Sequence, residues 1–177
     1  MTDVGAGPTS PRPFRLGRRG RQITLIMHLV SSVAWLGLDI ILLTLGIAAA
    51  NDASTRHARY LAMQLLIDTL LLPLGLLSIA TGLLLVVGGR WGLLRHKWVG
   101  TKFLLSVASV AAAWLALRPR VDTAVAVSLR PGTAKALFSS AYAPGWMLVI
   151  APSVGCVLYL TATVLGVMKP GRRPTRS

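Results

Sequence analysis

The sequence predicts an all-α protein, a four-helix transmembrane bundle with both termini in the cytoplasm. Two features of the composition and one of its arrangement lead to this class. Hydrophobic residues make up 54% of the 177 residues and charged residues only 14%, against about 25% charged in an ordinary soluble domain. The apolar residues form four long runs, and most of the charges lie between and outside them. This segregation is typical of an integral membrane protein.

Each apolar run is long enough for a spanning helix, because about 20 apolar residues cross the hydrocarbon core of a bilayer. The second run contains Pro73, which should kink its helix and free a carbonyl group. The stretch 121–129, after the third run, is weakly apolar and is a candidate for a segment on the membrane surface. We therefore expect a membrane domain over 23–168, with helices at about 23–50, 60–89, 98–117 and 144–168.

The distribution of Lys and Arg predicts the orientation, because basic residues favour the cytoplasmic side of a membrane. The N-terminal arm, residues 1–22, holds five of them, and the connection 90–102 and the tail 169–177 hold four each. The other connections, 51–60 and 118–143, hold two and four. We therefore expect the arm, predicted to be disordered, and the tail to be cytoplasmic, which agrees with an even number of spans.

The composition also excludes several classes of protein. The net charge of +14 is explained by topology and by contact with anionic lipid at the cytoplasmic face. Nucleic acid is not an expected partner, because little folded soluble surface remains to present the charge. The single cysteine, Cys156, excludes an internal disulfide and a multi-cysteine metal site. No phosphate loop, Ser/His/Asp arrangement or histidine pair at metal spacing stands out, so the sequence identifies no catalytic residues, leaves open whether the protein is an enzyme, and predicts no metal site.

Four ionisable residues fall inside the predicted spans, where such groups are costly and face other helices or water. They are His28 and Asp39 in the first run, Asp68 in the second and Lys102 in the third. The first helix has one polar face, because residues 3, 4, 7 and 11 positions apart return to the same side of a helix. That face consists of His28, Ser31, Ser32, Trp35 and Asp39.

Small residues also gather on single faces of the later helices, such as Gly75 and Gly82 in the second run and Gly155 in the fourth. Small residues let helix backbones approach closely in lipid, and hydroxyl groups bond across the interface. A compact bundle is therefore predicted. The same glycine faces would permit self-association.

The ionisable residues leave alternatives open. His28 is either a hydrogen-bonded structural residue or a ligand. Lys102 either snorkels to the cytoplasmic interface or meets His28 in the inner leaflet. Asp39 and Asp68 either bond hydroxyl groups and cap a kinked helix, or carry a proton or an ion. Because the two acids lie on successive antiparallel helices, we expect them close together in the outer half or facing different cavities.

Short motifs in the first three runs resemble those of known membrane families. Over about residues 23–117 the pattern resembles small uncharacterised four-helix bacterial membrane proteins. More distantly, it is similar to the copper-resistance CopD-like membrane domain and to the haem-dependent membrane protoporphyrinogen oxidase of the HemJ type. The motifs are His28-Leu29-Val30, Trp35-Leu36-Gly37, Asp68, Pro73, Thr81-Gly82-Leu83, Trp91-Gly92-Leu93, His96-Lys97-Trp98-Val99 and Lys102.

In the oxidase family, a first-helix histidine and a third-helix lysine serve the haem site. The resemblance therefore implies His28 and Lys102 as the matching positions. The family's arginine soon after the first-helix Trp-Gly stretch is absent here, and Asp39 occupies that neighbourhood. The resemblance thus supports binding of haem b without supporting the oxidase activity.

Three functions are compatible with these residues. The first is a multi-pass protein of the bacterial plasma membrane that acts as an accessory or small-ligand-binding bundle, alone, as a homo-oligomer or with a membrane partner. The second is a membrane redox protein that binds haem b, with His28 as axial ligand and Lys102 or His96 supporting the propionates or the opposite face. The third is a proton- or cation-linked carrier that uses Asp39 and Asp68.

Overall fold

The computed structural model describes residues 16–88, 97–130 and 134–168, and these ranges contain helices and no strands. The second apolar run forms three helical elements that follow one another without a break: α2, the π-helical turn η1, and α3. The elements in chain order are α1 (Arg18–Asn51), α2 (Arg56–Leu66), η1 (Ile67–Leu71), α3 (Leu72–Val87), α4 (Lys97–Ser128), the 3₁₀ helix η2 (Ala134–Phe138) and α5 (Pro144–Met168).

Four helical segments of the described chain are long and apolar enough to cross a membrane: Arg18–Asn51, Arg56–Val87, Phe103–Ser128 and Pro144–Val164. The all-α class and the four spans expected from the sequence are therefore confirmed. By length and composition, the chain is a multi-pass membrane protein.

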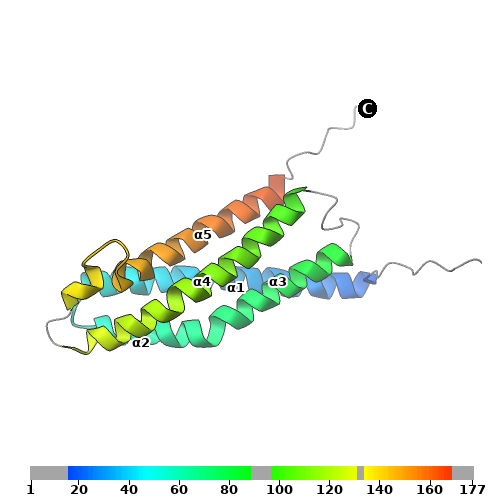
Figure 1. The fold of residues 1–177 in the computed structure, drawn as a ribbon. Helices are drawn as coiled ribbons and strands as arrows, with labels where there is room; N and C mark the ends of the chain where they lie inside the picture. Colours follow the sequence, from blue (N-terminus) through cyan, green and yellow to red (C-terminus); the bar gives the residue numbers. More distant parts are fainter. Residues whose placement is uncertain (1–15, 89–96, 131–133, 169–177) are drawn as a thin grey trace, which may run out of the picture.

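The four spans run side by side along one axis (Figure 1). The start of α1, the end of α3, the start of α4 and the end of α5 lie at one end of the bundle, here called the terminus end. The opposite end, where α1 turns into α2 and α4 is followed by η2, is called the hairpin end. At the terminus end, α4 and α5 lie apart from α1 and α3, whereas the helices converge towards the hairpin end.

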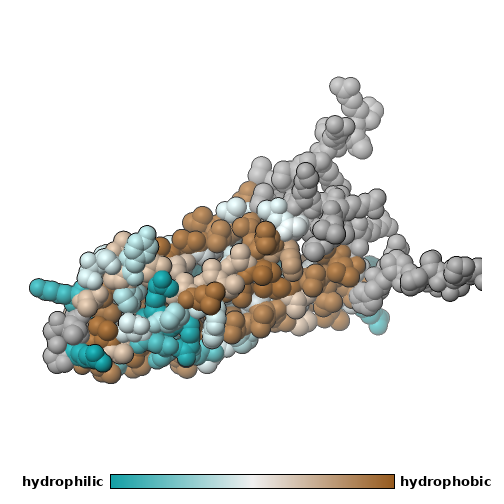
Figure 2. Space-filling view, viewed as in Figure 1, coloured by the Kyte–Doolittle hydropathy of each residue, from teal (hydrophilic) through white to brown (hydrophobic). Residues whose placement is uncertain are grey.

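Large hydrophobic side chains cover the outside of the bundle. Val30, Val33, Leu76, Leu104 and Val157 are each 57–68% exposed. A soluble monomer rarely exposes apolar patches of this extent, so this surface is the one that faces lipid. Figure 2 shows it over the middle of the bundle, with hydrophilic side chains gathered towards the hairpin end.

The tightly packed core lies nearer the hairpin end. Its fully buried residues come from every span and from η2: Leu42, Tyr60, Met63, Ile67, Val121, Leu137 and Leu148. The terminus half holds fewer buried residues, and several are polar, such as Ser31 and Thr81. Packing is therefore uneven along the bundle axis, which leaves room for a cavity in the terminus half.

The distortion expected at Pro73 takes the form of the π-helical turn η1, which ends at Leu71, two residues before the proline. Proline has no N–H group to donate to the carbonyl four residues earlier, so the preceding turn widens. Figure 1 shows the bend between α2 and α3 at this point.

The end of the third span was predicted too early, and the surface segment at 121–129 was wrong. Helix α4 continues to Ser128, and Val121 and Ala124 are fully buried in the core. The cluster of charges near Arg118 suggested a helix end because a charged group is costly in lipid. Ion pairs formed by Arg118, described below, remove that reason. Similarly, α1 starts at Arg18, inside the arm that was expected to be disordered.

Candidate ligand-binding cavity

Glycine residues on neighbouring helices make room for the polar face of α1. A Cβ atom on Gly82 would lie 3.1 Å from Cε1 of His28, and one on Gly75 would lie 2.5 Å from Cζ3 of Trp35. Both glycines belong to α3, so α1 presses its two largest polar-face side chains directly against the α3 backbone. This is the close approach that small residues permit in a membrane bundle.

His28 is held against α3 by hydrogen bonds. Its Nδ1 atom lies 3.0 Å from the carbonyl oxygen of Ser78 and 3.3 Å from Oγ1 of Thr81. A carbonyl oxygen can only accept, so the Ser78 contact places the proton on Nδ1. This bond fixes the orientation of the ring. It satisfies a structural histidine, and it is also the support that metal-ligating histidines commonly receive, so both readings of His28 stay open.

A cavity of about 360 Å³ lies beside His28, between α1, α3, α4 and α5. Its volume lies at the lower end of the range for small-molecule sites, about 300–1,000 Å³. Hydroxyl groups from all four helices line it, together with two aromatic rings and aliphatic side chains. The polar and aromatic lining residues are His28, Ser32, Trp35, Ser78, Ser106, Ser109, Tyr159 and Thr163.

Several lining hydroxyl groups already bond within the protein. Ser32 and Ser78 join α1 to α3 through their hydroxyl oxygens, 2.9 Å apart. Ser109 donates to the carbonyl of Leu105 in its own helix, at 2.7 Å. Each bond uses one hydroxyl proton, that of Ser109 and that of either Ser32 or Ser78, and leaves oxygen lone pairs that can accept from a bound molecule. The cavity is thus apolar in most directions, with acceptor groups at defined points.

Asp39 lies against Gly155 of α5, another residue that lines the cavity. A Cβ atom on Gly155 would lie 2.6 Å from Oδ2 of Asp39. The carboxyl group is 3% exposed, and Oδ2 has no hydrogen-bond partner. Trp35, one turn earlier on α1, donates a side-chain hydrogen bond to the group. Asp39 is therefore a buried acid that lies beside the cavity, behind Gly155.

Asp68, the other intramembrane acid, pairs with a cation. Its Oδ1 atom lies 2.7 Å from Nε of Arg118 on α4. Arg118 also pairs with Asp122 one turn later, and Asp122 accepts from Gln64 of α2 at 2.7 Å. The structure therefore gives Asp39 and Asp68 different partners. The Arg118–Asp122 spacing of four residues was a signal for this cluster that the sequence prediction did not use.

The other predicted haem-site residues fall largely outside the described part. The backbone of Lys102 lies in the second turn of α4, and its side chain is not among those the structure describes. His96 lies in the range 89–96, also outside the described residues. Whether Lys102 meets His28 therefore stays a prediction.

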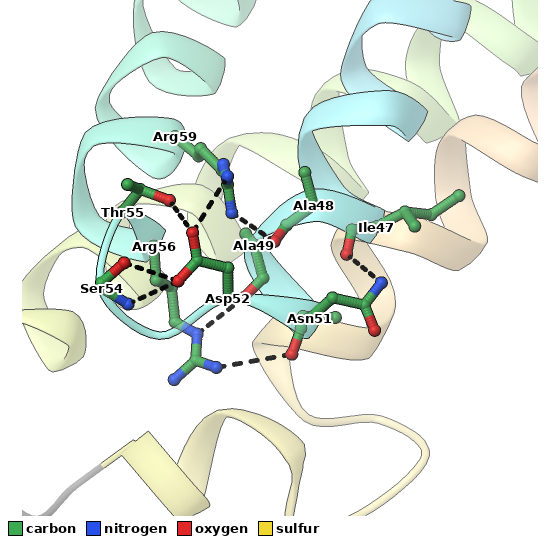
Figure 3. Close-up of polar contacts among 10 residues, drawn as sticks. Ile47, Ala48, Ala49, Asn51, Asp52, Ser54, Thr55, Arg56 and Arg59 are labelled. Carbon is green, nitrogen blue, oxygen red and sulfur yellow. Dashed lines mark hydrogen bonds and ion pairs between the residues drawn. The ribbon is translucent and has the colours of Figure 1, made fainter.

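The hairpin end carries a dense polar network that closes the α1–α2 connection (Figure 3). Asp52 accepts from the side chain and backbone N–H of Ser54 at 2.6 and 2.9 Å, from Thr55 at 2.6 Å and from Arg59 at 3.2 Å. The hydrogen bonds from Ser54 and Thr55, with the charge of Arg59, hold the pKa of Asp52 well below its usual range.

Two arginines complete this network by capping α1. Arg56 donates to the carbonyl of Ala49 at 2.7 Å, and Arg59 donates to that of Ala48. Cations at a helix C-terminus satisfy its unpaired carbonyl groups and complement its dipole. Arg56 also lies over the ring of Phe138, 5.3 Å from its centre. The network is structural: it fixes the hairpin end and leaves the terminus half as the place for a ligand.

Comparisons of the chain with protein-family models, with curated proteins and with solved structures found no match. The resemblance noted in the sequence therefore stays an expectation. The physical basis for a function is the cavity and the side chains around it.

Proposed function

We propose that this chain is a multi-pass protein of the bacterial plasma membrane that binds a small ligand in the cavity between α1, α3, α4 and α5. The observation that carries the proposal is the 360 Å³ cavity lined by hydroxyl groups from all four helices, beside an oriented histidine. A purely structural bundle has no need of it, because close packing is what holds helices together in lipid.

The lining indicates what the ligand is like. Most of the wall is aliphatic or aromatic, so the ligand enters from the lipid or crosses an apolar path. Ser32, Ser106 and Ser109 supply hydrogen-bonding groups at intervals. A compact ligand with one or two polar atoms fits this pattern.

We propose that the terminus end faces the cytoplasm. The described part of that end carries Arg18, Arg19 and Arg21 in the first turn of α1. Basic residues are retained on the cytoplasmic side and meet anionic lipid there. The predicted arm and tail would extend this positive surface.

Filling the cavity tests the ligand-binding proposal. The Ser109→Leu variant places a larger apolar side chain in the cavity wall. Thr161→Leu is the matched control, because Thr161 is exposed on α5 and bonds only to the carbonyl of Val157. We expect 1-naphthol, a two-ring alcohol, to bind the wild type and the control alike in nanodiscs, with binding about tenfold weaker in Ser109→Leu. Equal binding to all three proteins would contradict the proposal.

Binding of haem b is a second candidate, favoured by the bond between His28 and the Ser78 carbonyl. The volume of the cavity disfavours haem binding. A cavity of about 150 Å³ holds one benzene, so 360 Å³ accommodates roughly two such rings, fewer than a porphyrin contains. A porphyrin would require α4 and α5 to move away from α1.

An absorption spectrum separates the two candidates. We expect protein purified after expression with supplied haem to show no stoichiometric Soret band, oxidised or dithionite-reduced. A stoichiometric band that disappears in a folded His28→Ala variant would establish the haem alternative instead.

A carrier that uses both acids has less support, because Asp68 already has Arg118 as its partner. Asp39 forms no ion pair with another described residue.

A further inference from the structure

The buried carboxyl group of Asp39 is only partly compensated, by the side chain of Trp35. It is 3% exposed, its Oδ2 atom has no hydrogen-bond partner, and no ion pair found among the described residues includes it. An ionised carboxylate deep in a membrane is stable only when a cation joins it; otherwise the group must be neutral. Asp39 is therefore either neutral or joined by a positive charge that the described residues do not supply.

Asp39 lies close enough to the cavity for a cation bound there to compensate its charge. The cavity-lining residues of α1 end at Trp35, and Asp39 follows one turn later, about 6 Å along the helix. Gly155 contacts both the carboxyl group and the cavity. Having no side chain, Gly155 puts only its backbone between Oδ2 and the cavity space. Asp39 itself does not line the cavity; its carboxyl group lies behind Gly155, beside the end of the cavity nearest the hairpin end.

The rest of the cavity wall suits a cation. Trp35 and Tyr159 supply aromatic faces, which attract organic cations. The serine oxygens can accept hydrogen bonds from an ammonium group. None of the described lining residues is Lys or Arg, and the α5 residue against which the Asp39 carboxyl group lies is Gly155.

We propose that the cavity binds a small organic cation, an amine or quaternary ammonium with one apolar group, and that Asp39 is its counter-charge. This inference rests on the proposed function and names the class of ligand. The cationic group lies toward Asp39 and Trp35, and the apolar group extends towards His28 between α1 and α4. Asp68 has no such role, because it is ion-paired with Arg118 and does not line the cavity.

A pair of isosteric probes tests the charge directly. Benzyltrimethylammonium and neopentylbenzene have the same shape, with nitrogen replaced by carbon, and each is measured by equilibrium dialysis against wild-type protein in nanodiscs. We expect the ammonium to bind at least about tenfold more tightly. Equal affinity, or tighter binding of the neutral probe, would overturn the inference, and this comparison requires no variant.

Two isosteric variants show which carboxylate the binding of the ammonium depends on. Asp39→Asn removes the charge next to the cavity, whereas Asp68→Asn removes a carboxylate that is ion-paired with Arg118 and lies away from the cavity lining. We expect the ammonium to lose about tenfold in affinity in Asp39→Asn and less than twofold in Asp68→Asn, with neopentylbenzene unchanged in both. Undiminished ammonium binding in a folded Asp39→Asn protein would refute the role of Asp39.

The inference and the proposed function fail in different ways. If neopentylbenzene binds, and Ser109→Leu weakens it, while the ammonium does not bind more tightly, the cavity is a ligand site for neutral molecules and only the inference is wrong. If neither probe nor 1-naphthol responds to Ser109→Leu, both are wrong.

Discussion

At the scale of single residues, glycines decide where the polar side chains of α1 lie. Gly82, Gly75 and Gly155 each leave space for one of them, His28, Trp35 or Asp39. The sequence predicted both the polar face of the first helix and the small-residue faces of the later helices. It did not predict which glycine meets which side chain, because that depends on the relative height of helices that only packing determines.

A matched pair of glycine variants tests this packing. A Cβ atom on Gly75 would lie 2.5 Å from the Trp35 ring and 2.8 Å from Cγ2 of Val110, whereas one on Gly37 would meet nothing within 4 Å. We expect Gly75→Ala to lower the free energy of unfolding by about 1–3 kcal/mol through overpacking. Gly37→Ala should be neutral or raise it by up to about 1 kcal/mol, because alanine favours the helix. The measurement is denaturant unfolding in detergent, and equal effects would refute the packing role of Gly75.

At the scale of elements, hydropathy located the four spans but misplaced the start of the first and, by more residues, the end of the third. The third run loses its apolar character near Arg118, although α4 continues to Ser128. Arg118 pairs with Asp68 of the second span and with Asp122 of its own helix. Pairing across helices cannot be deduced from one run alone, since it depends on which helices are neighbours. The second span shows the opposite case, because Pro73 is a local signal and the π-helical turn ends two residues before it.

Asp39 and Asp68 show the same limit of prediction from sequence at the candidate site. Both were candidates from the sequence, where each is an Asp within an apolar run. The structure separates them by their partners: Asp68 has Arg118, and Oδ2 of Asp39 has no partner. Partnership is a tertiary property, so the cation site could be proposed only after the helices had been placed.

At the scale of the whole molecule, the bundle divides into two halves along its axis. The hairpin half has a fully buried core and the capped α1–α2 connection. The terminus half contains the cavity, and α4 and α5 lie apart from α1 and α3 there (Figure 1). A rigid half joined to a looser half suits a binding bundle, because the looser helices can admit a ligand while the other half keeps the fold.

Photolabelling tests most directly whether this cavity holds a ligand. The probe is 1-azidonaphthalene, irradiated with the protein in nanodiscs with and without excess 1-naphthol, followed by peptide mapping of the labelled residues. We predict that the labelling suppressed by 1-naphthol falls on the cavity wall, around residues 25–35, 78–79, 105–110 and 155–163. Labelling that 1-naphthol does not suppress, confined to lipid-facing residues such as Leu76, Leu104 and Leu115, would contradict a ligand-binding cavity in this bundle.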